Sequence, residues 1–298
     1  MTTYDIIKSN KRRSFFLIAV FVILVLAVGY FAGYYMGIGY TGLSLAFGLA
    51  VFMTLLSFFR GDSIALWTAG AKPIGKKDNP YVYRLVENLC ITAGLPRPDI
   101  YIIDDQALNA FATGRDPDHA SLALTSGLVD KLENEELEGV IAHELSHIKN
   151  YDIRLMTIVI VLVGTIMLIG HWFIRFRIIG GRRNRSSGGG RLGGILMIVS
   201  LVFLILSPIF AKLIQFAISR KREYLADASG SLITRYPEGL ANALEKISQY
   251  NKPMKKATSA TAHLFISNPF GAKAKKGFKK FFSTHPPVEK RIKALRNM

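Results

Sequence analysis

The chain of 298 residues has a single cysteine, Cys90, so no disulfide can form within it. Cys90 lies in an apolar helical stretch, where a cysteine usually behaves as a small buried hydrophobic residue. Nothing in the cysteine content therefore indicates an oxidising compartment.

Acidic residues are few, because 21 Asp and Glu stand against 38 Lys and Arg, which gives a net charge of +17. In a soluble domain this balance would indicate a nucleic-acid partner. The sequence has no recognisable DNA- or RNA-binding motif, and its basic residues sit at the ends of long apolar blocks. That arrangement favours anchoring beside anionic lipid head groups, so we expect a lipid bilayer and no nucleic acid as partner.

Charged residues are absent from residues 14–59, a run long enough for two membrane spans of about 20 residues each. Gly37, Gly39 and Gly42 predict the turn between them. Residues 14–59 are too long for the apolar part of a cleaved signal peptide and lack a small-x-small cleavage site, so an uncleaved anchor is predicted. Basic residues before and after the run place both flanks in the cytoplasm; they are Lys8, Lys11, Arg12, Arg13, Arg60, Lys72, Lys76 and Lys77.

Two further uncharged runs, residues 155–174 and 192–211, are each just long enough to span a membrane. The Gly- and Arg-rich loop between them, residues 175–191, would lie outside if both runs crossed, against the positive-inside tendency. This second hairpin therefore either crosses, lies partly buried in protein, or is re-entrant.

The region between the two apolar parts has the pattern of a soluble mixed domain. It predicts a helix over Pro80–Ala93, a strand over Asp99–Ile103, and extended stretches over residues 109–113 and 121–125. A further helix is expected to begin with Asn134 as its N-cap.

That last helix carries the motif His143-Glu144-Leu145-Ser146-His147. Residues four apart share one face of a helix, so both imidazoles can bind a single ion. Glu144 is turned by about 100 degrees, beside the ion, where it can accept a proton from water at the metal. Two imidazoles and a carboxylate suit zinc, which lowers the pKa of water to about 7.

The alternative to a metal site is a helix that carries two histidines on its surface. Apolar residues surround the motif, so unpaired His and Glu side chains inside this helix would be costly to bury. The neighbouring apolar residues are Val140, Ile141, Ala142, Leu145 and Ile148. A metal site is therefore favoured.

A third protein ligand is needed, and Glu223 is the best candidate. If the helices that carry His147 and Glu223 continue to the second apolar hairpin, the two side chains lie about 12 and 18 Å beyond it. The hairpin thus returns Glu223 to the same side at a similar height. The acids Glu135 and Glu136 lie on the histidines' own helix and fit its surface better.

The order of these motifs resembles the HtpX-type heat-shock membrane proteases, relatives of the CaaX prenyl endopeptidases. The resemblance is carried by residues 109–114 (Asn-Ala-Phe-Ala-Thr-Gly), 138–152, 223–227 and 284–287 (Thr-His-Pro-Pro), with Arg291. It implies an α-rich membrane protein with transmembrane helices and a cytoplasmic α+β zincin-like (gluzincin) domain holding one Zn²⁺. The implied activity is zinc-dependent endoproteolysis of misfolded or damaged membrane proteins in quality control and stress response, with Glu144 as catalytic base and Glu223 as third ligand.

The resemblance also suggests supporting roles. Asn109, Ala110, Phe111 and Ala112 would form an edge strand to which an extended substrate adds by main-chain hydrogen bonds; otherwise they are a plain strand and turn. Asp227 and Asp152 would accept hydrogen bonds from the ligating histidines, or else be helix-surface charges. His285 and Arg291 would lie near the zinc and stabilise the oxyanion, unless the His-Pro-Pro sequence is only a turn before the last helix.

The expected organisation has four parts. These are a transmembrane hairpin (1–60), a cytoplasmic part with the zinc-binding helix (61–154), a second apolar hairpin (155–211), and a cytoplasmic part with the third ligand and a basic tail (212–298). A multi-pass protein of the cell membrane with a cytoplasmic active site follows, and its own glycine-rich loop is a possible target of self-cleavage.

Two other classes compete with the enzyme. A membrane adaptor would keep zinc as a closed structural site with four protein ligands, whereas a catalytic zinc leaves one position for water. A channel or transporter is disfavoured because the spans contain no acid or base to line a path. The sequence does not determine the oligomeric state.

Overall fold

The structure is a computed structural model, which describes residues 3–160, 220–250, 252–258, 261–271 and 286–298. Most of the second apolar hairpin, its arginine-rich loop and His285 lie outside the described residues.

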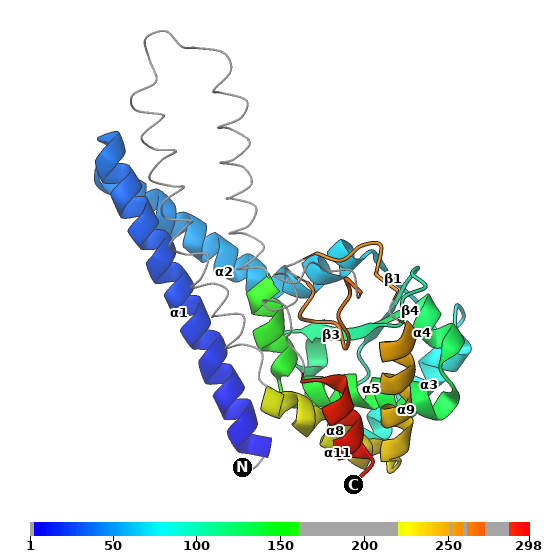
Figure 1. Ribbon diagram of the computed structural model, residues 1–298. Helices are drawn as coiled ribbons and strands as arrows, with labels where there is room; N and C mark the ends of the chain where they lie inside the picture. The colour runs from blue at the N-terminus through cyan, green and yellow to red at the C-terminus, as the bar shows by residue number, and fades with distance from the viewer. Residues whose placement is uncertain (1–2, 161–219, 251, 259–260, 272–285) are drawn as a thin grey trace.

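The first two helices form a hairpin whose turn lies far from the sheet and from the helices around it (Figure 1). Helix α1 spans Thr3–Met36 and α2 spans Tyr40–Ala69, with the turn at Gly37 and Gly39, while Gly42, also predicted in the turn, already lies in α2. Within them, Ile7–Phe31 and Tyr40–Ala69 are long and apolar enough to cross a membrane. Helix α2 runs beyond the expected boundary at residue 60, because its last turns are buried beneath the sheet and Gly70 ends it in the left-handed conformation.

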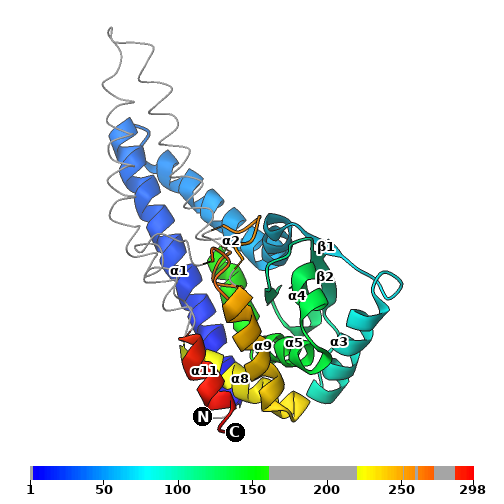
Figure 2. The same cartoon turned by 45° about the vertical axis from the view of Figure 1, so that its right-hand side comes forward.

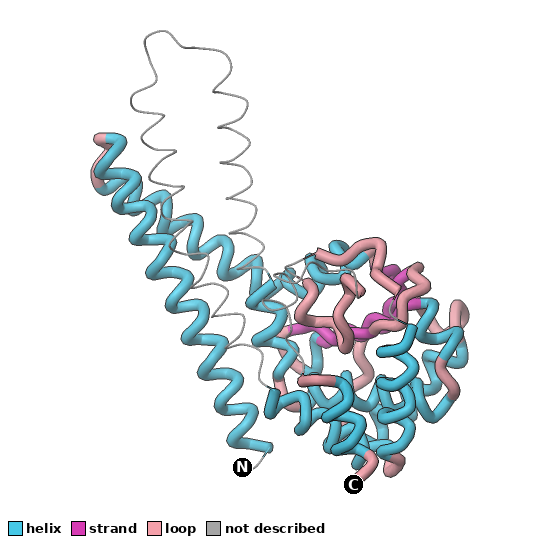
Figure 3. Tube along the Cα trace, in the orientation of Figure 1, coloured by secondary structure: helices cyan, strands magenta, loops and turns pink. Residues whose placement is uncertain are grey.

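Four strands form one small sheet in the order β1-β2-β4-β3 (Figure 3). They are β1 (Ala71–Pro73), β2 (Asp99–Ile103), β3 (Ala110–Gly114) and β4 (Ala120–Thr125). Strand β2 runs parallel to β4, while β1 and β3 pair antiparallel at the two edges. Strand β3, which carries the Ala-Phe-Ala-Thr-Gly part of the motif, is therefore an edge strand, as predicted, while Asn109, also expected in it, lies just before it.

Both faces of the sheet are covered, because alternate side chains of a strand point to opposite sides. On one face Ala112 and Leu122 join the main core beneath helices α3 (Pro80–Ala93), α5 (Asn134–Lys149) and α9 (Pro237–Tyr250). On the other face Phe111 and Ala123 meet the end of α2 and the side chains of Met254, Leu264 and Phe265.

The remaining described elements are short. They are the 3₁₀ turn η1 (Pro117–His119), α4 (Ser126–Lys131), a helical stretch over residues 152–160, α8 (Arg220–Thr234) and α11 (Val288–Leu295). Helix α5 lies among α3, α8 and α9 and is buried for most of its length (Figure 2).

The predicted N-cap of α5 was wrong by one residue. Asn134 is already helical, and its side chain donates to Glu138. Glu133 is the cap, and its backbone N–H donates to the Glu136 side chain at 2.9 Å. This bond satisfies a donor that the first turn of the helix leaves open.

Helix α5 approaches α9 so closely that Gly139 has no room for a side chain. A Cβ there would lie 2.6 Å from the backbone nitrogen of Leu240 and 2.8 Å from its Cα. We expect Gly139→Ala to destabilise the protein by about 1–3 kcal/mol, because backbone atoms cannot rotate away and overpacking outweighs the better helix propensity of alanine. Thermal unfolding in detergent measures the effect. Gly48→Ala is the control, since a Cβ at that helical position meets nothing within 4 Å, and an equal melting temperature for both variants would contradict the prediction.

Candidate metal centre

Helix α5 presents two imidazoles to one point. His143 and His147 are both buried, and their Nε2 atoms lie 3.2 Å apart. Their spacing of four residues places them on one face, as expected.

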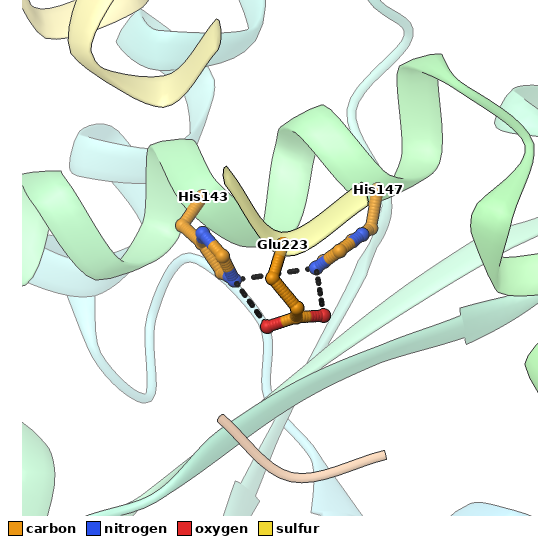
Figure 4. Close-up of side chains that lie close together, drawn as sticks. All are labelled: His143, His147 and Glu223. Atoms are coloured by element: carbon orange, nitrogen blue, oxygen red, sulfur yellow. Dashed lines mark hydrogen bonds and ion pairs between the residues drawn. The ribbon is translucent and has the colours of Figure 1, made fainter. Parts of the chain in front are cut away.

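Helix α8 supplies the third member from the opposite side (Figure 4). Glu223 Oε1 lies 3.7 Å from His147 Nε2, and Glu223 Oε2 lies 4.0 Å from His143 Nε2. The two helices come close because Gly230 faces α5: a Cβ there would lie 3.0 Å from the backbone nitrogen of His143. The predicted grouping of His143, His147 and Glu223 is thus present in space, with ligand atoms all within 4.8 Å of one another.

These distances fit a zinc ion. Two nitrogens bound tetrahedrally to zinc at about 2.0–2.1 Å lie about 3.3–3.4 Å apart, close to the separation of the two Nε2 atoms. The donor set of two imidazoles and one carboxylate is also one that catalytic zinc takes.

Each imidazole is fixed through its other nitrogen. His143 Nδ1 lies 3.0 Å from Asp227 Oδ1, and His147 Nδ1 lies 3.0 Å from Asp152 Oδ2. A carboxylate at Nδ1 sets the tautomer that leaves Nε2 free for a metal. Asp227 reaches His143 because it lies four residues after Glu223, on the same face of α8.

The carboxylates shift the pKa values of the groups they touch. Burial lowers the pKa of His147, but the hydrogen bond that its Nδ1–H donates to Asp152 and the charges of Glu223, Asp152 and Glu144 outweigh it and raise the pKa to about 9. Burial raises the pKa of Asp227, yet the charge of Arg291 and the hydrogen bonds from His143 and Arg291 lower it below its ordinary value.

Arg291 closes the cluster from α11. Its guanidinium is buried and holds Asp227 in two hydrogen bonds, of 2.6 Å from Nη2 and 2.9 Å from Nε. Its Nη1 lies 3.6 Å from Glu223 Oε2. A planar guanidinium suits this paired contact better than an ammonium would.

Glu144 lies beside the cluster and joins it to the sheet. Its side chain is buried, and Oε2 accepts the backbone N–H of Ala112 at 2.9 Å. The catalytic base expected from the sequence therefore faces the edge strand β3.

The outer edge of β3 is formed by alternate residues. Asn109 O accepts from Thr125 N, so odd-numbered residues bond toward β4, and Ala110, Ala112 and Gly114 present their polar backbone groups outward. Ala110 O accepts from Ile266 N at 3.0 Å. The Asn109 side chain hydrogen-bonds to the backbone of Ser267. Its Nδ2 donates to Ser267 O, and its Oδ1 accepts from Ser267 N.

Some contacts at this centre were not foreseen from the sequence. Thr157 accepts the backbone N–H of Gly114 at 3.1 Å. Asn10, on α1, and Arg222, next to the third ligand, both reach Asp152. The only sequence signal for Asn10 is an amide at the start of an apolar span.

The sequence of the chain matches a known protein family. The sequence profile of peptidase family M48 matches residues 76–298. The chain belongs to peptidase family M48. Membership confirms the prediction of a metallopeptidase, a hydrolase of peptide bonds.

Individual relatives match over the full length. The Protease HtpX homolog of Caldanaerobacter subterraneus subsp. tengcongensis is 44% identical to this chain over 302 residues, which cover 100% of this chain and 98% of the relative. Proteins of the same name are 46% identical over 297 residues in Dictyoglomus thermophilum (100% and 95%) and 45% over 295 residues in Tropheryma whipplei strain Twist (99% and 98%). The predicted resemblance to the HtpX type is confirmed.

The fold also resembles a crystal structure of Ste24p from S. mikatae, with a TM-score of 0.52. The sequences are 19% identical, and the match covers 98% of this chain and 67% of that one. At this identity the likeness concerns the fold alone.

The raised pKa of His147 predicts how metal affinity depends on pH. Without a metal, His147 is protonated below about pH 9 and must lose that proton to bind one. The affinity for Zn²⁺ should therefore rise by about tenfold per pH unit between pH 7 and 9 and level off above, as one proton is released. Calorimetry in buffers of different ionisation enthalpy counts that proton. A zinc affinity that does not change between pH 7 and 9 would contradict the raised pKa.

Proposed function

We propose that this M48 peptidase is a zinc-dependent endopeptidase of the cell membrane that cleaves extended stretches of misfolded or damaged membrane proteins. The observation that carries the proposal is the position of Glu144, which follows the candidate ligand His143 on α5 and accepts the outward N–H of Ala112 on β3.

His143, His147 and Glu223 would hold the zinc, one ion per chain. When bound, zinc supplies a Lewis acid that lowers the pKa of water to about 7 and polarises a carbonyl. Glu144 takes a proton from the attacking water as the oxygen bonds to the scissile carbonyl carbon. The same carboxyl then gives the proton to the leaving amine as the C–N bond breaks.

Arg291 supports this step through two neighbours. It neutralises Asp227, so that the His143 ring stays fixed, and it adds positive charge near Glu223 where negative charge develops. His285, the other residue proposed to stabilise the oxyanion, lies outside the described residues.

The substrate would bind as an added strand along β3. The outward carbonyls of Ala112 and Gly114 are placed to accept substrate N–H groups, and the scissile bond would then lie beside Glu144. At Ala110 the carbonyl already accepts from Ile266 N, so residues 265–267 limit how far the added strand extends.

The membrane setting is supported by the start of α1. Its residue Asn10 contacts Asp152 at the metal centre, so the N-terminal end of this candidate span and the metal centre would lie on the same side of the membrane. Basic residues flank the hairpin on that side, which the positive-inside tendency assigns to the cytoplasm. A site at the membrane surface suits membrane-protein substrates, and the relatives' name is consistent with such a protease.

The adaptor alternative calls for a fourth protein ligand. Among the described residues the metal-binding group has three members. Three protein ligands are the number that a catalytic zinc takes, with water in the fourth position, which favours the enzyme.

Glu144→Gln tests the catalytic base. We expect casein cleavage by purified, zinc-loaded protein to fall by about 10²–10⁴-fold, because the amide cannot take a proton, while zinc content stays unchanged. Glu135→Gln, an exposed acid on the same helix, is the matched control and should keep full activity. Zinc-loaded wild type that leaves casein and unfolded membrane proteins uncut would overturn the proposal.

Methylated peptides test the added strand. N-methylation of the substrate residue whose N–H faces Ala112 O should lower kcat/KM about 2- to 10-fold, the usual contribution of one hydrogen bond. Methylation one residue further along is the control, because that N–H points away from β3. Equal losses at both positions would argue against pairing with this edge.

A further inference from the structure

The first helix of the chain contributes a side chain to the surroundings of the metal centre. Asn10 on α1 is 2% exposed, and its Nδ2 donates to Asp152 Oδ1 at 2.7 Å and to Asn150 O at 2.9 Å. Its Oδ1 accepts from Arg222 Nη1 at 3.3 Å. An amide buried with partners for both ends has one defined orientation.

Asp152 joins this amide to the candidate ligand His147. Its Oδ2 accepts from His147 Nδ1 at 3.0 Å, and its Oδ1 accepts from Asn10 and, at 3.2 Å, from Arg222 Nη1. The carboxylate is fully buried. A buried carboxylate is stable only where hydrogen bonds replace its hydration, so the donors decide where it sits.

Asn10 lies outside the part of the chain that matches the peptidase family, residues 76–298. It is 142 residues from Asp152 in sequence, on a helix that is a candidate membrane span. The same end of α1 makes one more contact, since Lys11 lies over the Tyr151 ring with Nζ 4.5 Å from its centroid, and Ser14 is buried there. The docking of α1 is thus coupled to the position of Asp152.

We propose that Asn10 is a positioning residue for the metal centre: by holding Asp152, it fixes the His147 ring in the orientation that binds the metal. This inference rests on the proposed metal site and adds that the site is complete only when α1 is docked. The membrane anchor is then part of the metal centre and more than a tether. Any displacement of α1 loosens the hold on the metal.

The test measures metal binding rather than cleavage. Full-length protein carrying Glu144→Gln, which prevents self-cleavage, is compared with the same protein carrying Asn10→Leu, a change that keeps side-chain size but removes both hydrogen-bonding groups. Loss of a partner behind a metal ligand typically costs about 10–100-fold in metal affinity, so Asn10→Leu should weaken Zn²⁺ binding by that factor in competition with a chelator. It should also shift the visible absorption bands of the Co²⁺-substituted protein, because cobalt takes the same ligands.

Ser14→Ala is the matched control. Ser14 is buried on the same face of α1, but its hydroxyl donates to the Asn10 carbonyl within its own helix, at 2.9 Å. We expect its zinc affinity and cobalt spectrum to equal those of the parent. Combining Asn10→Leu with Asp152→Asn should weaken zinc binding little more than Asp152→Asn alone, since both changes act through one contact. Asn10→Ser, whose side chain is too short to reach Asp152, replaces Asn10→Leu if the latter does not fold.

The outcomes separate the two proposals. Parent protein that binds no Zn²⁺ at all refutes the metal site and the proposed function with it. Parent protein that binds Zn²⁺, together with an Asn10 variant of equal affinity and equal cobalt spectrum, refutes the positioning role alone, even if that variant melts at a lower temperature.

Discussion

The structure depends on the need to satisfy a buried ionic cluster. His143, Glu144, His147, Glu223 and Arg291 are all enclosed, and a charge removed from water is tolerated only with partners on every side. Each group therefore has a specified neighbour, and the packing of the helices has to bring these neighbours together. The same requirement explains why the helix that carries the histidines is buried for most of its length.

Two helices meet that requirement with the same spacing. His143 and His147 lie four residues apart on α5, and Glu223 and Asp227 lie four apart on α8, so each helix offers one row of polar groups to the other. Glu223 faces the two Nε2 atoms, while Asp227 holds His143 from behind. Gly230 allows the backbones to approach, and α11 brings Arg291 over the second row. Hydrogen bonds of this kind preorganise the side chains, which reduces the reorganisation that catalysis requires.

The sheet has a different role in the proposed function, because the substrate would add to its edge strand β3. Strand β3 bonds to β4 through one set of backbone groups and offers the alternate set to Glu144, Thr157 and Ile266. Burial of both faces by the core and by the end of α2 leaves only the edge available for function. The first hairpin contacts the rest of the described structure from both of its helices: the last turns of α2 pack beneath the sheet, and Asn10 of α1 hydrogen-bonds to Asp152.

The sequence by itself determined the features that depend on local spacing. The uncharged run and its glycines gave the first hairpin, alternation and turn residues gave β2, β3 and β4, and the interval of four residues placed both histidines on one helical face. Glu223 could be predicted as a ligand because two apolar runs of equal length, residues 155–174 and 192–211, would return the chain to the side from which it left if they form a hairpin. The N-cap of α5 was misplaced by one residue, since Glu133 and Asn134 both suit a helix start and the side-chain bond to Glu136 decides between them.

Only the tertiary structure decided the contacts between segments far apart in the chain. That Asp152 faces His147, that Asn10 and Arg222 hold Asp152, and that Ile266 bonds to the edge of β3 all follow from how apolar faces pack. Periodicity reports which face of a helix is buried but not which other helix covers it, so a polar residue at the start of an apolar span gives no indication of its partner. The two histidines follow from local spacing, and Asp152 and Asp227 were expected from the resemblance, whereas the contacts of Asn10, Arg222 and Ile266 are set by packing.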